Sequence, residues 1–345
     1  MIEHLGDPTA EGRARRRLAC ELVLPLRWVG PCPVDEEVDL AAYLGRVVRW
    51  CDVTVVDGSP GPEAAARRAA WPQEVRVVPP DPRWAGPNGK VTGAMTGIAT
   101  ARHPVVVIAD DDVRYGYDEL VAVVKALRLA DVVVPQNVPT EWPWWVWWES
   151  GRMLLNRAVD VDWPGTMGCR RDTVLAAGGW SPDVLFENLE MARTVEAAGG
   201  SVVHRPDILV RRRPPSRRHF LRQRVRQAYE DAASPVRWAL GLATMPVLLV
   251  VGRRAPAVVA LAATVVAVAE AGRRRSGGRK AFPPWAPVAA PLWVLERGIC
   301  SWLALGVRLR GGVRYHGRRL SVAAHSARAL RRQVPQTHSR VGTGG

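Results

Sequence analysis

Residues 105–112 decide the fold, and they read Val-Val-Val-Ile-Ala-Asp-Asp-Asp. Five apolar residues in succession suit a central strand of a parallel sheet, because such a strand is covered on both faces. The three carboxylates follow at the end of the strand, which is the edge where open α/β sheets bind their ligands. This stretch therefore predicts a layered α/β domain with an acidic site at the carboxyl end of its sheet.

Other apolar runs of strand length alternate with segments of helical period on both sides of this stretch. Strand, helix and strand in succession is the pattern that builds a parallel sheet. The sequence thus predicts a Rossmann-like, mostly parallel sheet with helices on both faces. We expect strands at residues 18–26, 53–56, 75–78, 105–109, 132–134 and 167–171, and helices at 40–50, 62–70, 93–101 and 185–198, with another that starts at Asp172 and stops at Gly178 and Gly179.

Composition and charge restrict the class of protein. With 345 residues and 48% apolar side chains, the chain can fill a substantial core, which excludes a fully disordered protein. Residues 1–204 carry 21 basic and 28 acidic side chains, whereas residues 205–345 carry 27 basic and 5 acidic ones, so the two parts face different partners.

The N-terminus has no long apolar stretch, and we expect the first half to stay in the cytoplasm. The five cysteines have no disulfide or zinc spacing and are expected to be packing residues in a reducing compartment: Cys20, Cys32, Cys51, Cys169 and Cys300.

Two uncharged runs follow in the C-terminal third, at residues 238–252 and 255–269. Each has 15 residues, or about 22 Å of helix, which is shorter than the roughly 30 Å hydrocarbon layer of a membrane. Two thin spans with snorkelling arginines, a re-entrant hairpin, and a soluble Ala/Val-rich helical domain all fit this pattern. The basic residues from Arg273 to Lys280 favour a cytoplasmic end for the second run.

A third apolar stretch, residues 285–307, contains Glu296 and Arg297 at its middle. Charges at that depth favour an interfacial or re-entrant helix over a third span.

Charged residues also lie at the ends of other predicted strands and helices, as the acidic triplet does. Asp110 and Asp112 point the same way on an extended chain, so they are the expected metal pair, and their oxygen atoms suit Mg²⁺ or Mn²⁺. Asp57 ends another predicted strand in the same manner. Lys90 follows Asn-Gly where a helix begins, and a helix N-terminus with a lysine suits phosphate. Each piece alone is also explained by an ordinary acidic or Asn-Gly turn.

In this order and spacing, the segments resemble the family-2 glycosyltransferases, which are inverting nucleotide-sugar enzymes of GT-A fold. Within that family the chain looks most similar to the ceramide glucosyltransferase branch, in which membrane segments follow a cytoplasmic catalytic domain. The matching stretches are Val55–Ser59, Asn88–Ala101, Ala109–Asp112, Gly165–Arg171 with Gly178–Trp180, Phe186–Val195 and Gln223–Gln227.

The resemblance implies a domain organisation and a set of binding residues. It implies an N-terminal extension at residues 1–17, a GT-A catalytic domain at 18–235, membrane-associated helices at 236–307 and a basic tail at 308–345. Asp110 and Asp112 would hold Mn²⁺ or Mg²⁺ against the diphosphate of the donor. The residues that would bind the nucleotide sugar are Asp57, Lys90, Asp110, Asp111, Gln223 and Arg226, the last near the diphosphate or the acceptor.

Two positions depart from the family pattern. The family's base is the aspartate of a Glu-Asp pair, but this chain has Glu187 followed by Asn188, and a neutral amide cannot accept a proton. Glu187 and Glu190 are three residues apart on one helical face, so as a partly buried pair one of them could act as base, Glu187 first and Glu190 second. The alternative is two exposed helix-start acids and lost catalysis. Gln227 also replaces a tryptophan, which weakens any assignment of the acceptor.

The aromatic and basic segments suggest a lipid surface. Five tryptophans fall between residues 142 and 148, which fits lipid entry at a membrane interface, a carbohydrate-stacking platform or an aromatic core corner. The basic run 211–226 has almost no aromatic interleaving, so anionic lipid suits it better than nucleic acid. We expect residues 312–320 to dock at the cytoplasmic membrane face and residues 333–345 to be disordered.

The sequence therefore predicts a membrane-associated inverting glycosyltransferase whose catalytic domain is cytoplasmic. It would move a sugar from a UDP- or GDP-sugar to a hydroxyl of a lipid or lipid-linked acceptor at an anionic membrane surface. One alternative is a glycosyltransferase-like scaffold of envelope assembly that has lost its base. A nucleic-acid binder rests on charge alone.

Overall fold

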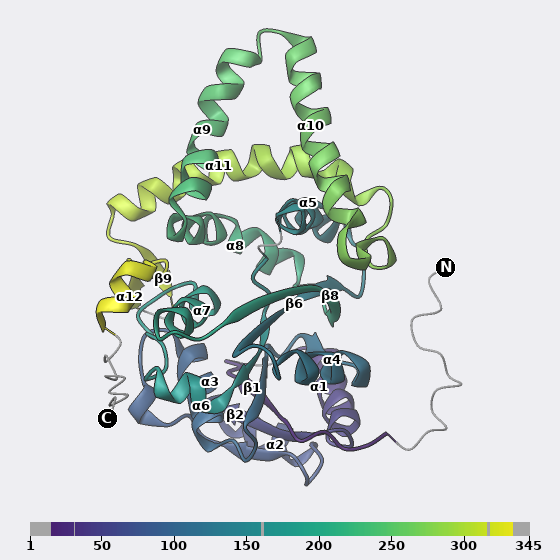
Figure 1. The fold of residues 1–345 in the computed structure, drawn as a ribbon, viewed down its shortest axis with the longest axis vertical. Coiled ribbons are helices and arrows are strands. Elements are labelled where there is room, and N and C mark those ends of the chain that lie inside the picture. The colour runs from purple at the N-terminus through teal and green to yellow at the C-terminus, as the bar shows by residue number, and fades with distance from the viewer. Residues whose placement is uncertain (1–14, 31, 160–161, 316–317, 334–345) are drawn as a thin grey trace, which may run out of the picture.

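The computed structural model describes residues 15–30, 32–159, 162–315 and 318–333. Within them, eight strands form one sheet in the order β3-β2-β1-β4-β7-β6-β8-β5 (Figure 1). Parallel pairs join β3, β2, β1 and β4 and also join β6 to β8, whereas β7 runs antiparallel between β4 and β6. The predicted mostly parallel α/β sheet is confirmed. The strands are β1 (Glu21–Leu26), β2 (Asp52–Asp57), β3 (Arg76–Val78), β4 (Val105–Ala109), β5 (Val113–Arg114), β6 (Val132–Pro139), β7 (Thr166–Arg170) and β8 (Val202–Arg212).

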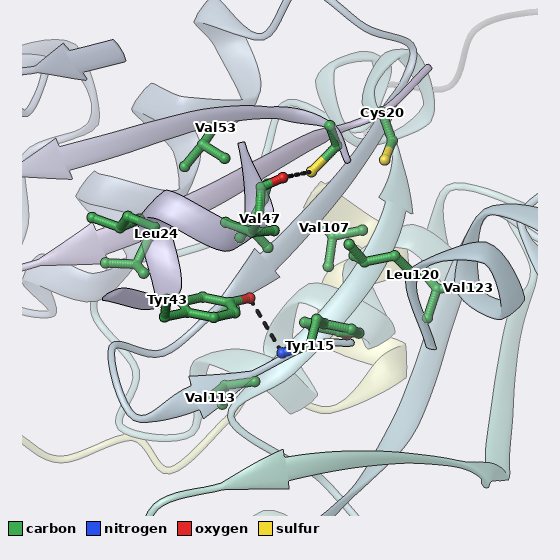
Figure 2. Packing of buried hydrophobic residues seen from close by; sticks show 14 of the residues in the cluster. Cys20, Leu24, Tyr43, Val47, Val53, Val107, Val113, Tyr115, Leu120 and Val123 are labelled. Atoms are coloured by element: carbon green, nitrogen blue, oxygen red, sulfur yellow. Dashed lines mark hydrogen bonds between the residues drawn. The ribbon is translucent and has the colours of Figure 1, made fainter. Parts of the chain in front are cut away.

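Helices cover both faces of the sheet, and each face has its own buried core. Along β1, Leu22 and Leu24 face the core under α1 and α4, while Val23 between them faces the core under α3 and α7. This alternation is what a strand covered on both sides requires. Figure 2 shows the first core, where the Tyr43 hydroxyl accepts a hydrogen bond from the Tyr115 backbone N–H. The helices of this domain are α1 (Val34–Val47), α2 (Pro62–Ala69), α3 (Gly89–Thr100), α4 (Tyr117–Ala126), α6 (Arg171–Ala176) and α7 (Glu187–Ala197).

Several boundaries differ from the predicted ones. Helix α1 begins at Val34, six residues before the predicted start at residue 40. The prediction missed its first turn because the acidic residues there interrupt the apolar period. Helix α3 begins at Gly89, where the Asn88 side chain accepts a hydrogen bond from the Lys90 N–H and caps the helix. Gly178 and Gly179 have φ of +80° and +75° and end α6 as expected.

Strand β8 was not predicted. It contains His204, Arg205, Pro206 and Asp207, which break any apolar or alternating pattern. The strand tolerates them because it lies near the sheet edge, and only the two-residue β5 pairs on its outer side.

The C-terminal helices form a second layer on one side of the sheet domain. In Figure 1, α9 and α10 rise as a hairpin, α11 lies across its base, and α5 and α8 lie between α11 and the sheet. Two of these helical stretches, Ala255–Lys280 and Ala286–Leu309, are long and apolar enough to cross a membrane, since an 18-residue window in each has a mean hydropathy of 1.8 and 1.3, respectively. The helices are α5 (Trp144–Ala158), α8 (Arg217–Glu230), α9 (Pro235–Val251), α10 (Ala255–Arg274) and α11 (Ala290–Leu309).

Helix α11 buries its central charges against the sheet domain. Glu296 forms an ion pair with Arg224 of α8, and Arg297 lies 3.3 Å from the carboxylate of Asp231. The side of the helix opposite Arg297 leaves Ile299 and Trp302 about half exposed. A helix with one charged, buried side and one apolar, exposed side is the arrangement expected for an interfacial helix.

Part of the segment predicted as a basic tail is folded. Strands β9 (Val313–Tyr315) and β10 (Arg318–Leu320) form an antiparallel hairpin, and α12 (Ala327–Gln333) follows. Leu320 and Leu330 are buried. The chain after β10 therefore packs on the sheet domain. Residues 334–345, most of the stretch predicted to be disordered, lie outside the described residues.

Candidate active site

A cleft of about 580 Å³ lies at the carboxyl ends of β1, β2 and β4. Its floor comes from the strand ends, including Val56 and Gly58 after β2 and the triplet Asp110–Asp112 after β4. Its far wall comes from α8, α11 and β9, which contribute Arg226, Arg297 and Tyr315. The cleft thus lies between the sheet and the C-terminal helices.

Lys90 connects two carboxylates that line the cleft. Its Nζ lies 2.6 Å from Asp110 Oδ1 and 2.8 Å from Glu187 Oε1, so the first turn of α3 links the ends of β4 and α7. Burial opposes the charge of Lys90, but the two carboxylates outweigh it and raise its pKa above the ordinary value. Lys90 is therefore a fixed cation at a helix N-terminus, which is a suitable arrangement for phosphate.

The three carboxylates of the acidic triplet have different partners. Asp110 and Asp112 share Arg212, whose Nη2 lies 3.4 Å from Asp110 and whose Nε donates to Asp112 at 2.9 Å. Asp111 points elsewhere and accepts a hydrogen bond from the Trp28 indole. Burial raises the pKa of Asp112, and the neighbouring carboxylates add to this effect against the opposing charge of Arg212.

The residues at the triplet fit a divalent cation. In the described part of the chain, no group of three His, Cys, Asp or Glu side chains is placed to hold a metal. However, Oδ1 of Asp112 is buried and has no hydrogen-bond partner among the described residues. Two aspartate oxygens can serve Mg²⁺ or Mn²⁺ when the substrate's phosphates and water supply the other ligands. Asp110 and Asp112 would hold such an ion.

Gly165 leaves room for the Asp110 carboxylate. Its N–H donates to the Asn137 side chain, and its carbonyl accepts the Asp110 N–H at 2.9 Å. A Cβ at Gly165 would lie 2.1 Å from Asp110 Oδ2. Only glycine therefore permits this carboxylate position.

Asp57 is at the predicted strand end, but its carboxylate does not line the cleft. It accepts hydrogen bonds from the Ser59 N–H at 2.8 Å and from Arg68 Nε at 2.7 Å, and its side chain is buried. Its neighbours Val56 and Gly58 do line the cleft. Asp57 thus shapes the loop after β2 and turns its carboxylate away.

The expected pairing of Glu187 with Glu190 is wrong. Glu187 lines the cleft and binds Lys90. Glu190 is fully buried outside the cleft lining, where its carboxylate accepts from the backbone N–H of His325 and contacts the His325 ring. Because the folded segment after β10 supplies this partner, the helical spacing could not predict that the two side chains have separate surroundings.

The two residues that depart from the family pattern, Asn188 and Gln227, each form a hydrogen bond with another residue. The Asn188 amide donates to the Pro164 carbonyl at 2.6 Å, a bond that an ionised aspartate could not form. Gln227 accepts from Arg224 Nη1 at 2.9 Å. Both side chains line the cleft.

Helix α8 presents a stripe of polar side chains to the cleft, namely Gln223, Arg226 and Glu230. The predicted residues Gln223 and Arg226 are joined by Glu230, which the sequence analysis missed although it continues their helical spacing. Arg226 Nε lies 3.6 Å from Glu230 Oε1, and its guanidinium lies 5.8 Å from the Tyr315 ring centre. Tyr315 belongs to the stretch expected to dock at a membrane face, and no local signal indicated its place in the cleft.

The tryptophan-rich segment forms an aromatic corner. Trp142 packs edge-on against Phe282 and Trp285, and Trp144 packs against Phe220. Trp144 is 46% exposed. None of the five tryptophans at residues 142–148 is among the described residues that line the cleft, so the carbohydrate platform is not supported.

Comparisons with known proteins agree with this part of the structure. Residues 64–140, which include Lys90 and the triplet, match the model of glycosyl transferase family 21. No curated protein matches the chain. The match to the family model supports a glycosyltransferase.

Solved structures show more distant likeness. The mannosyltransferase PcManGT from Pyrobaculum calidifontis, in complex with GDP-Man and Mn²⁺, is 17% identical over 83% of this chain and 88% of that chain, with a TM-score of 0.48. GalNAc-T7 with UDP, GalNAc and Mn²⁺ is 12% identical over 58% and 44%, with a TM-score of 0.41. A mycobacterial protein is 16% identical over 59% and 70%, with a TM-score of 0.39. At TM-scores below 0.5, none of these likenesses identifies a function.

Proposed function

We propose that the protein is a membrane-associated, inverting glycosyltransferase that moves a sugar from a UDP- or GDP-sugar to a hydroxyl of a lipid or lipid-linked acceptor. The observation that carries this proposal is the convergence of Lys90, Asp110 and Asp112 in one cleft at the carboxyl edge of the sheet. The family match covers the same three residues. Together they describe a site for a nucleoside diphosphate and its counter-charges.

The donor binds through its diphosphate at this edge. Lys90 and the N-terminus of α3 contact the phosphates, and Arg226 approaches them from α8. Gln223 and Asp111 line the rest of the nucleotide site, and Asp57 holds the loop after β2 that borders it. A divalent cation held by Asp110 and Asp112, when bound, neutralises the charge that develops on the departing diphosphate.

Transfer needs a carboxylate that accepts the proton of the acceptor hydroxyl. The oxygen attacks the anomeric carbon in line with the departing diphosphate, and inversion follows from this single displacement. The sequence favoured Glu187 as this base, with Glu190 second. Of the two, Glu187 lies in the cleft, where its ion pair with Lys90 also places it beside the donor phosphates.

A lipid acceptor is supported by the place of the cleft relative to the apolar helices. The α9–α10 hairpin stands away from the sheet domain and exposes Leu249 and Val250 by 73% and 76% (Figure 1). Helix α10 has 20 residues, or about 30 Å, and its uncharged part, residues 255–269, covers about 22 Å of the roughly 30 Å hydrocarbon layer. Because Arg297 of the interfacial helix α11 lines the cleft, an acceptor held in the membrane surface can reach it.

The cytoplasmic orientation rests on the charges at the base of this hairpin. Arg273, Arg274 and Arg279 follow the apolar part of α10 on the side of the sheet domain. Under the positive-inside rule they keep that domain in the cytoplasm and near anionic headgroups.

Thermal shift with nucleoside diphosphates tests the donor site. UDP or GDP at one hundred times its Kd should stabilise the folded state by about 2.7 kcal/mol, and only with Mn²⁺ or Mg²⁺ present. With an unfolding entropy near 2.1 cal/mol/K per residue over 345 residues, this corresponds to about 4 °C in Tm. Asp112→Asn should remove the metal-dependent part of the shift.

Two results would overturn the assignment in different ways. No shift with any nucleoside diphosphate would contradict the donor site itself. A shift without any release of nucleoside diphosphate from UDP- or GDP-sugars would favour the scaffold that has lost its base, to which the amide at Asn188 points.

A further inference from the structure

The reaction needs a proton acceptor, and the family's position for it is filled by Asn188. The amide of Asn188 donates to the Pro164 carbonyl, so it is held in place as a donor and has no basic atom for a proton. The base must therefore be another side chain that lines the cleft, either a carboxylate or His219, and Nε2 of His219 is already in contact with the Gln223 amide.

Most carboxylates of the cleft are already bound to cations. Asp110 and Asp112 lie against Lys90 and Arg212. Asp162 accepts from Gln136, Asn156 and Arg152, and these contacts hold its pKa below the ordinary value although burial acts the other way. Such carboxylates are weak bases, because their charge is stabilised by the partner.

Glu187 and Asp231 are also paired. Glu187 Oε1 lies 2.8 Å from Lys90 Nζ, and its Oε2 accepts from the Asn88 amide at 3.4 Å. Asp231 lies 3.3 Å from Arg297 Nη1. Glu187 is therefore better placed to orient Lys90 at the donor phosphates than to receive a proton.

Glu230 differs from all of these. Its carboxylate lies at the end of α8, and its side chain is 20% exposed at the cleft. In the described part of the chain, its one ion pair is the 3.6 Å contact with Arg226, and no hydrogen bond reaches it. Among the described cleft carboxylates that pair with a cation, Glu230 has the longest contact, 3.6 Å against 3.3 Å for Asp231, whereas Asp111 accepts from the Trp28 indole.

The surroundings of Glu230 raise the proton affinity of its carboxylate. Burial raises the pKa of Glu230 to about 7, and the carboxylates of Glu187 on α7 and Asp231 add to the rise. Arg226 on the same helix and Arg297 on α11 oppose it. A base whose pKa lies near the working pH is well suited to proton transfer.

We propose that Glu230 is the general base that activates the acceptor hydroxyl. The hydroxyl proton passes to a carboxylate oxygen of Glu230 while the acceptor oxygen forms its bond to the anomeric carbon. The bond from that carbon to the diphosphate oxygen breaks, and its electron pair leaves with the nucleoside diphosphate. The proton then passes from Glu230 to water. This inference rests on the proposed function and replaces Glu187 by Glu230 in the role of the base.

The test compares Glu230→Gln with Glu187→Gln in the full chain. The rate is the release of UDP or GDP from UDP-glucose or GDP-mannose, with Mn²⁺ and vesicles of phosphatidylglycerol and diacylglycerol. We expect Glu230→Gln to lower kcat by about 10²- to 10⁴-fold with little change in the KM of the donor. Glu187→Gln should mainly raise that KM. Glu196→Gln, at an exposed position of α7, is the matched control and should behave as the wild type.

The pH profile separates a base from a structural residue. Because only the ionised carboxylate accepts a proton, the wild-type rate should rise with pH and level off above about 7. In Glu230→Gln this rise should disappear. In Glu230→Ala, sodium azide should restore turnover at least ten-fold, because azide attacks the anomeric carbon as an anion and needs no base.

The outcomes are distinguishable. If Glu230→Gln keeps UDP or GDP binding by thermal shift but transfers within three-fold of the wild-type rate, Glu230 is not the base and the glycosyltransferase proposal stands. The same holds if the pH rise persists unchanged or azide has no effect. If the wild type neither binds the diphosphates nor releases them from any of these donors, the proposed function fails and this inference fails with it.

Discussion

Arg224 joins α8, in the far wall of the cleft, to α5 and α11. Its removal should destabilise the protein measurably. Its side chain is 7% exposed and forms ion pairs with Glu149 of α5 and Glu296 of α11, which are 12% and 14% exposed. Glu149 keeps a second partner in Arg152, but Glu296 loses its cation, and Glu296 Oε1 already has no hydrogen-bond partner among the described residues. Removing one partner of such a buried network costs about 3–5 kcal/mol.

The expected change in Tm follows from the size of the chain. At about 2.1 cal/mol/K per residue, 345 residues give an unfolding entropy near 0.7 kcal/mol/K, so Arg224→Met should lower Tm by about 4–7 °C. Differential scanning calorimetry in detergent, at one scan rate for all variants, measures it. Arg222→Met, at an exposed position of the same helix, is the control and should cost less than about 0.5 kcal/mol.

A double variant identifies the cause of the loss. Arg224→Met combined with Glu296→Met removes the unpaired carboxylate, so it should recover at least half of the lost Tm. A Tm for Arg224→Met within 1 °C of the wild type would refute the reasoning, because it would mean that water screens the network. Failure of the double variant to recover would show that the loss comes from packing of the arginine stem and not from its charge.

Two further predictions concern the metal pair and the hairpin. Gly165→Ala should weaken Mn²⁺-dependent UDP or GDP binding at least ten-fold, because its Cβ would lie 2.1 Å from Asp110 Oδ2 and displace that carboxylate; isothermal titration measures this. Leu249→Asp with Val250→Asp should remove most binding to phosphatidylglycerol vesicles in a flotation assay, since two charges would enter the hydrocarbon layer at a cost of about 2.5–3.5 kcal/mol each.

Each of these variants has a matched control. Gly306→Ala adds a Cβ where no atom lies within 4 Å, so diphosphate binding should be unchanged. Leu129→Asp changes a 92% exposed leucine on the sheet domain and should leave flotation as in the wild type. Normal binding by Gly165→Ala would show that Asp110 has another usable position, and normal flotation of the hairpin variant would contradict its insertion.

The sheet and the acidic edge could be predicted because local signals decide them. The run at residues 105–109 is apolar throughout, and strand spacing predicted a common side for Asp110 and Asp112. Both acids do share Arg212, whereas Asp111 turns to Trp28. Residues 110–113 form a turn in which the Val113 N–H donates to the Asp110 carbonyl, so Asp110 and Asp112 meet at Arg212 through this turn and not through strand alternation.

The surroundings of single carboxylates could not be predicted in the same way. Glu190 has the helical spacing of a partner for Glu187, but its environment is set by His325, which lies 135 residues later in the chain. Asp57 likewise points to Arg68 and away from the cleft. Such contacts depend on how distant segments pack, and nothing in the neighbouring residues specifies them. The position of Glu230 in the cleft could have been predicted, since it continues the helical spacing of Gln223 and Arg226 on α8, but its ionic surroundings could not.

The cleft is assembled from two parts of the chain with different tasks. The donor side comes from residues 25–112 and the short loop at Gly165, which belong to the acidic N-terminal part, and residues 64–112 of it lie within the stretch that matches the family model. The far wall comes from α8, α11 and β9, in the basic C-terminal part. Because α11 packs against α8 through Arg224 and Glu296, we expect a movement of the apolar helices in a membrane to shift the helix that carries Arg226 and Glu230. Donor binding should therefore survive in detergent, whereas sugar transfer should depend on the lipid that surrounds the C-terminal helices. Equal transfer rates in detergent and in phosphatidylglycerol vesicles would contradict this coupling.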